Sequence, residues 1–148
     1  MALKYYRLAA GQGYDVAQNN LGWMYEEGRG VPKSNIEAVK YYRLAAEEGD
    51  SRGLTYLGEL HEDGLGVPRS DSEAVKYYRL AADKGFARAQ TNLGWMYKEG
   101  LGVERNFEEA VKYYRLAAKQ GDEQGQQKLA WMYKRGRGVE QNDTKSYM

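Results

Sequence analysis

The sequence predicts an all-α fold, a right-handed α-solenoid of antiparallel helix pairs in 36-residue repeats. The first observation is a nonapeptide, Ala-Val-Lys-Tyr-Tyr-Arg-Leu-Ala-Ala, which occurs at 38–46, 74–82 and 110–118 and in a near copy at 2–10. The second is that apolar residues recur within each repeat at helical spacing. The third is that glycines separate these stretches at the same 36-residue step. A fixed period between about 20 and 50 residues is typical of a solenoid.

An apolar stripe predicts the first helix of each repeat. Ala17, Leu21 and Tyr25 recur at i, i+4 and i+8, which places them on one face of a helix. Gly28 suits the left-handed position that follows a helix end, and Gly30 lets the chain turn again. We interpret the Gly-x-Gly-Val stretch as a helix stop, because a phosphate-binding loop would need a preceding strand and a longer glycine pattern.

Capping sequences predict where the second helix of each repeat begins. Three residue pairs have capping-box spacing or a variant of it: Ser34 with Glu37, Ser70 with Glu73, and Asn106 with Glu109. Glycines recur in the middle of the first helices at Gly22, Gly58 and Gly94, where glycine costs about 1 kcal/mol relative to alanine. We therefore expect the backbone of another helix to pass close to them, with Ala45 and Ala46 as the facing surface.

The order of the elements follows from the register of the repeats. We expect a lone second helix at about 2–12, three complete repeats, a first helix at about 123–135 and a helical stub from Asn142 to Met148. The prediction is thus a single array over 1–148, with about four repeats and with incomplete repeats at both ends.

Composition excludes several classes of partner. The 148 residues include 22 Lys and Arg against 21 Asp and Glu, so the net charge of +1 offers no basic field for nucleic acid. The mean hydropathy is −0.84, and no apolar run approaches the roughly 20 residues of a membrane span. We expect no nucleic-acid partner and no membrane partner. The absence of a signal-peptide core and of cysteine favours a cytoplasmic location, although an export signal could be missing from this chain.

No constellation of residues predicts an enzyme. The only histidine, His61, takes the place of Tyr25 in its repeat, so we interpret it as a packing residue. No cysteine or second histidine exists to complete a metal site, and no serine has a lysine three residues on. We expect a protein without catalytic residues, metal or cofactor.

The motifs together resemble a known repeat. Leu-Gly-x-x-Tyr, then Gly-x-Gly-Val, then an Ala…Tyr…Ala-Ala helix at a 36-residue period is similar to the Sel1-like repeat, a relative of the tetratricopeptide repeat. The resemblance covers essentially all of the chain. It implies a bacterial adaptor that holds protein partners, with the first helices lining a concave wall. The secreted, cysteine-rich branch pins its helix pairs with disulfides, which this chain lacks.

Residues opposite the buried stripe of the first helices supply the candidate binding site. Three repeats have tryptophan there and the fourth has Glu59, so we expect this column, and that of Asn19, to face water. The candidate partner-binding residues of the concave face are Trp23, Trp95, Trp131, Asn19, Asn20, Glu59, Thr91, Asn92, Lys98 and Gln127.

Two compatible interpretations of the tryptophans remain open. They are anchors for an extended partner peptide that runs across several repeats, or they pack onto the neighbouring first helix. The wall also changes from Glu26 and Glu62 to Lys98 and Lys134 along the chain. The predicted function is a non-enzymatic scaffold that binds a protein or peptide. The alternative is an assembly element, or a piece of a longer array, that stacks head to tail.

Overall fold

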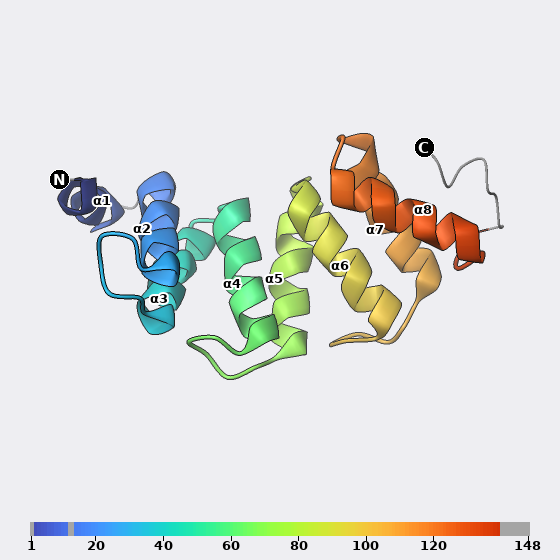
Figure 1. Cartoon of the computed structure of the whole chain (residues 1–148), viewed down its shortest axis with the longest axis horizontal. Coiled ribbons are helices and arrows are strands. Elements are labelled where there is room, and N and C mark those ends of the chain that lie inside the picture. The colour runs from blue at the N-terminus through green and yellow to red at the C-terminus, as the bar shows by residue number, and fades with distance from the viewer. Residues whose placement is uncertain (1, 12–13, 140–148) are drawn as a thin grey trace. The chain divides into compact units, whose positions relative to one another are not determined.

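The computed structural model describes residues 2–11 and 14–139, which form eight α-helices and no strand (Figure 1). The helices are α1 (Ala2–Gly11), α2 (Asp15–Glu27), α3 (Asn35–Glu47), α4 (Ser51–Asp63), α5 (Asp71–Asp83), α6 (Ala87–Glu99), α7 (Phe107–Lys119) and α8 (Glu123–Arg135). The predicted all-α repeat fold is confirmed. The predicted stub at 142–148 lies outside the described residues.

The helices divide into two compact units, residues 1–77 and 78–148. In the first unit α1 packs on α2, α2 on α3, and α3 on α4. In the second unit α6 packs on α7, and α7 on α8. Within each unit these helices thus pack on their neighbours along the chain, which is the contact pattern of a solenoid. The prediction of a single array over 1–148 stays a prediction.

The helix ends follow the predicted signals. The Ser34 hydroxyl accepts a hydrogen bond from the Glu37 N–H at 3.2 Å, and the Asn106 side chain accepts one from the Glu109 N–H at 3.1 Å. These bonds satisfy amides that the start of a helix leaves unpaired. Gly28 ends α2 with φ = 69°, the left-handed conformation that residues with a Cβ rarely adopt.

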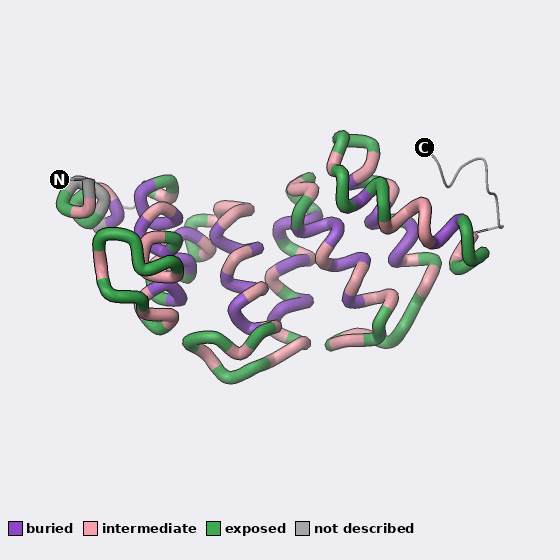
Figure 2. The backbone as a smooth tube through the Cα atoms, viewed as in Figure 1, coloured by how far each residue is buried: buried purple, intermediate pink, exposed green. Residues whose placement is uncertain are grey.

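A tyrosine from each of α3, α5 and α7 fills the core. Tyr42, Tyr78 and Tyr114 are fully buried, as are the first-helix leucines Leu21, Leu57 and Leu93. Buried residues lie on the helix faces that meet within each unit (Figure 2).

The mid-helix glycines make room for these tyrosine rings. A Cβ at Gly22 would overlap the ring of Tyr42, and a Cβ at Gly94 would overlap the ring of Tyr114. The prediction that Ala45 and Ala46 face these glycines is therefore wrong at Gly22, because the Tyr42 ring already fills the space. Ala45 and the Ala46 backbone lie instead against Gly53, near the start of α4.

Candidate partner-binding surface

The three tryptophans differ in their exposure. Trp23 on α2 is 48% exposed, and the Arg29 guanidinium lies 5.6 Å from the centre of its ring. Trp95 on α6 and Trp131 on α8 are half-buried. Trp131 packs against the buried cluster that includes Val111. Packing within the unit thus accounts for the partial burial of Trp131. All three tryptophans keep some solvent-exposed area.

In the second unit, two lysines lie over the two indoles. The Lys98 ammonium is 4.8 Å from the ring centre of Trp95 and 4.1 Å from that of Trp131, and the Lys128 ammonium is 4.8 Å from that of Trp95. Lys98 also pairs with the Glu99 carboxylate at 3.4 Å. Each cation–π contact contributes about 0.5–1 kcal/mol at an exposed site, so the contacts orient the indoles.

A small pocket opens among these side chains. It has a volume of about 150 Å³ and is lined by Lys98, Tyr114, Gln127, Lys128 and Trp131. Burial and the nearby Lys98 charge lower the pKa of Lys128, while Glu99 acts in the opposite direction. We call the surface formed by Trp95 and Lys98 of α6 with Gln127, Lys128 and Trp131 of α8 the α6–α8 surface.

The prediction that the Asn19 column faces water is wrong for its first three members. Asn19 is 4% exposed, Thr91 is 2% exposed and Thr55 is buried. The Asn19 amide donates to Asp50 at 2.5 Å, and the Thr91 hydroxyl donates to Asp122 at 3.0 Å. Asp50 and Asp122 are the N-cap residues of α4 and α8. Asn19 therefore links α2 to the start of α4, and Thr91 links α6 to the start of α8.

The other candidate residues keep access to solvent. Gln127 is exposed, and Asn20, Glu59 and Asn92 are half-buried. A role for any of the candidate residues in partner binding stays a prediction.

The hydroxyls of Tyr42 and Tyr114, which occupy the same place in their repeats, differ in their partners. In the first unit, the Tyr42 hydroxyl donates to a Glu26 carboxylate oxygen at 2.7 Å, and burial together with this bond raises the pKa of Tyr42. In the second unit, Lys98 takes the place of Glu26 in the repeat. The buried Tyr114 hydroxyl has no hydrogen-bond partner in the described part of the chain.

His61 sits in the core of the first unit, as its place in the repeat predicts. It is buried, and its ring stacks on that of Tyr77 with 5.6 Å between the ring centres. Burial lowers the pKa of His61, the Glu73 carboxylate raises it, and the Arg43 and Lys76 charges lower it further.

A series of arginine–tyrosine bonds was missing from the predictions. A second-helix arginine donates to the tyrosine hydroxyl of the following first helix at 2.6–2.8 Å in three cases: Arg7 to Tyr25, Arg79 to Tyr97, and Arg115 to Tyr133. The constant separation of 18 residues could have revealed the series. His61 interrupts it, because the repeat places Arg43 opposite histidine.

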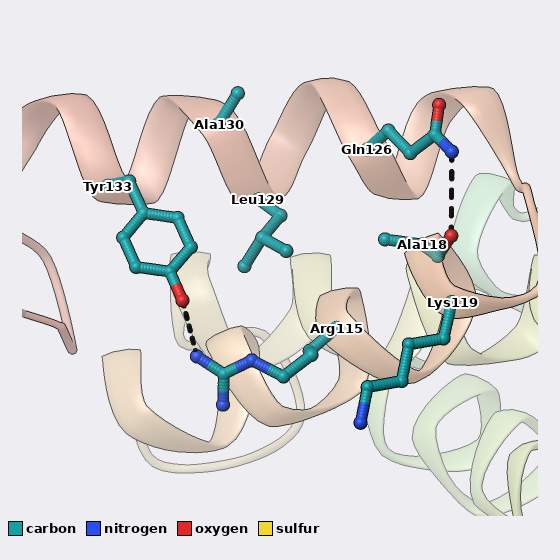
Figure 3. Close-up of a pocket in the computed structure, with 7 residues that line it drawn as sticks. All are labelled: Arg115, Ala118, Lys119, Gln126, Leu129, Ala130 and Tyr133. Carbon is teal, nitrogen blue, oxygen red and sulfur yellow. Dashed lines mark hydrogen bonds between the residues drawn. The ribbon is translucent and has the colours of Figure 1, made fainter. Parts of the chain in front are cut away.

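A larger groove lies between α7 and α8, with a volume of about 350 Å³ (Figure 3). It is lined by Arg115, Ala118, Lys119, Gln126, Leu129, Ala130 and Tyr133. The Arg115–Tyr133 bond crosses one end, and the Gln126 amide reaches the Ala118 carbonyl at 3.5 Å at the other. Ala118, Leu129 and Ala130 are the apolar residues of the groove lining.

Neither a metal cluster nor a membrane-crossing helix is found in residues 2–11 and 14–139. No three His, Cys, Asp or Glu side chains gather there closely enough to hold a metal ion. No helix in those residues has the length and apolar character to span a bilayer.

A family model decides how the repeats are classified. The Sel1 repeat model matches residues 1–14, 15–50, 51–86, 87–122 and 124–148. The chain belongs to the Sel1 repeat family. Sel1 repeat proteins are generally scaffolds for protein–protein interaction and are typically not enzymes. No curated protein sequence matches the chain.

Solved structures support the Sel1 repeat assignment. A protective antigen of uropathogenic Escherichia coli with an SLR fold is 44% identical, with a TM-score of 0.91 over 97% of this chain and 31% of that one. A Sel1 repeat protein from Oxalobacter formigenes is 37% identical, with a TM-score of 0.93 over 98% of this chain and 58% of that one. The chain thus spans less than two thirds of either protein.

A more distant structure shows only the shared fold. Helicobacter pylori cysteine rich protein B is 23% identical, with a TM-score of 0.65 over 84% of this chain and 89% of that one.

Proposed function

We propose that this Sel1 repeat chain is a non-enzymatic scaffold that binds a partner peptide or protein on its first helices, with the α6–α8 surface as the main contact. The observation that carries the proposal is that two half-buried indoles, Trp95 on α6 and Trp131 on α8, share a contact with Lys98 at a pocket that Lys98 and Trp131 line. Tryptophan is enriched among interface residues that dominate binding energy.

The α6–α8 surface has the composition of a binding site for an extended segment. The indoles offer flat apolar area that the lysine contacts hold in place, so a partner loses little entropy in ordering them. Gln127 is exposed beside the pocket and offers both an amide donor and an acceptor to a peptide backbone. The surface therefore combines apolar anchors with groups that fix the register of a peptide.

Selection from a random peptide library tests the proposal without a known partner. Peptides selected against the chain are titrated into it while the indole N–H signals of Trp23, Trp95 and Trp131 are followed by NMR. We expect the Trp95 and Trp131 signals to shift. Bound peptides that leave both signals in place would contradict the α6–α8 assignment.

A matched control comes from the second helices of the same unit. Leu80 and Leu116 are 47% and 39% exposed, so they also present apolar area to solvent. Replacing both by alanine removes exposed apolar surface away from the α6–α8 surface. The double variant is expected to bind the selected peptides with unchanged affinity, and a loss of affinity would move the binding site to the second helices.

A second candidate function is head-to-tail assembly, which the groove in Figure 3 favours. Leu129 is only half-buried there, whereas Leu21 and Leu93 occupy the same place in other repeats and are fully buried. The matching occupant is α1 of a second copy, because its sequence is a near copy of the nonapeptide of α3 and α7.

One residue of the groove argues against a tight assembly. Ala130 stands where Gly22 and Gly94 accommodate the rings of Tyr42 and Tyr114. An incoming tyrosine ring would meet the Ala130 side chain, so the groove fits a second helix less well than the inner repeats do. Capture of a partner on the α6–α8 surface is therefore the primary proposal.

A further inference from the structure

Two tyrosines at the same place in their repeats, Tyr42 and Tyr114, differ in the partners of their hydroxyls. Tyr42 lies in the core with its hydroxyl bonded to the Glu26 carboxylate at 2.7 Å. Tyr114 occupies the same place in its repeat and is 0% exposed, but its hydroxyl has no partner among the described residues. A buried polar group without a hydrogen bond is unfavourable, and native proteins rarely leave one.

The Tyr114 site has also gained positive charge. Lys98 replaces the carboxylate that Glu26 supplies in the first unit, and Lys128 lines the same pocket. The two ammonium groups are close enough for Lys98 to lower the pKa of Lys128, in addition to the effect of burial. The Glu99 carboxylate pairs with Lys98. Among the described residues, no carboxylate forms a salt bridge with Lys128.

We propose that this pocket of the α6–α8 surface binds the glutamate side chain of a partner peptide, whose carboxylate accepts the Tyr114 hydroxyl bond and lies against Lys98 and Lys128. The proposal rests on the proposed function, and it names the chemistry of the partner. The first unit shows the same arrangement within the chain, since Glu26 already provides a glutamate carboxylate to Tyr42.

The pocket suits a side chain of this size and charge. Its volume of about 150 Å³ admits a carboxylate with its methylene groups. The Trp131 ring would pack against those methylenes, and the Gln127 amide lies beside them. The carboxylate would also offset the repulsion between the two ammonium groups, and charge-assisted hydrogen bonds are stronger than neutral ones. We therefore expect an acidic peptide to bind this pocket more tightly than a neutral peptide of the same length.

The test uses capped peptides and the full chain at constant ionic strength. An acetylated, amidated tetraglutamate peptide is expected to shift the Trp95 and Trp131 indole signals in NMR titrations. The matching tetraglutamine peptide is expected to bind at least about tenfold more weakly, the loss expected when a charged hydrogen bond is removed. Equal affinity of the two peptides would overturn the proposal.

Two variants separate the pocket from general charge attraction. Tyr114→Phe removes only the hydroxyl and is expected to weaken tetraglutamate binding about three- to tenfold. Lys98→Glu supplies a carboxylate within the chain, as Glu26 does, and is expected to abolish binding. Lys119→Glu makes the same charge change outside the pocket, and an equal loss with this control would overturn the proposal.

Three further outcomes bear on this inference, and the last two separate it from the proposed function. If a tetraglutamine peptide with a free C-terminus binds as tightly as capped tetraglutamate, the pocket binds a C-terminal carboxylate, and the assignment to a glutamate side chain is wrong. If library peptides bind the α6–α8 surface without glutamate and are insensitive to Tyr114→Phe, the scaffold function stands and this inference fails. If tetraglutamate binds as described but no library peptide binds the α6–α8 surface, the glutamate pocket stands and the test of the scaffold function by library selection fails.

Discussion

The Tyr42 hydroxyl donates a 2.7 Å hydrogen bond to Glu26, whereas the Tyr114 hydroxyl, at the same place in the second unit, has no partner among the described residues. Tyr42→Phe is therefore expected to lower the free energy of unfolding by about 1–2 kcal/mol, because it removes a bond to a charged acceptor. Tyr114→Phe is expected to leave stability unchanged or to raise it slightly. Urea unfolding of the two variants measures the contrast, and equal losses would contradict it.

His61 predicts a specific dependence of stability on pH. Burial lowers the pKa of His61 in the folded chain, so the unfolded chain binds a proton more readily. The His61 contribution is complete above the unfolded pKa of about 6.5 and is lost as the pH falls through the lowered folded pKa.

Replacing His61 by tyrosine removes this dependence and completes the arginine–tyrosine series with Arg43. His61→Tyr is expected to raise the free energy of unfolding by about 0.5–1.5 kcal/mol at pH 7, the net value of one hydrogen bond. The gain should grow as the pH is lowered below about 6.5. Thermal unfolding across this range provides the measurement. A gain that shrinks at low pH would show that His61 is not the group responsible.

The Asn19–Asp50 bond is expected to couple α2 to the start of α4. Burial by itself would raise the pKa of Asp50, but the bonds from the Gly53 N–H and from Asn19 lower it overall. A double-mutant cycle of Asn19→Ala and Asp50→Ala should give a coupling of about 1–2 kcal/mol at pH 7. The coupling should be complete above the unfolded pKa of about 3.9 and should be lost as the pH falls through the lowered folded pKa of Asp50. Additive losses at pH 7 would show that the bond contributes nothing.

Ala130 provides a test of head-to-tail assembly. Ala130→Gly should strengthen self-association, because it opens the space that Gly22 gives to Tyr42, although glycine costs the helix about 1 kcal/mol. Sedimentation velocity over a range of concentrations detects the change. The matched variant Tyr6→Ala removes the tyrosine that α1 carries at the position of Tyr42 and should abolish the association. If Ala130→Gly associates no more strongly than the parent chain, assembly through this groove is contradicted.

The helices could be predicted from the sequence because their signals are local. The Ser34 cap and the Gly28 stop depend on residues close in the chain, and the structure has both. The glycine contacts depend on side-chain direction between helices, and there the prediction chose Ala45 where the Tyr42 ring lies.

The candidate site was only partly predictable for the same reason. Helical periodicity placed Trp23 on an open face, but it could not show that the Asp50 cap of the next repeat covers Asn19. The bond between them joins residues 31 positions apart, beyond the range of a single-helix pattern. In the sequence, the only sign of the unpartnered Tyr114 hydroxyl is that Lys98 replaces Glu26 between repeats. That change could be interpreted only once the structure showed the bond between Tyr42 and Glu26.

The most direct test of the scaffold function is the affinity of a library-selected peptide for the Trp95→Ala variant. Calorimetric titration should show a loss of about 2 kcal/mol or more, roughly 30-fold in Kd, because Trp95 anchors the α6–α8 surface. Circular dichroism should show helicity and thermal stability near those of the parent chain, because the indole is only half-buried. Undiminished affinity together with lost thermal stability would contradict the account and make Trp95 a packing residue.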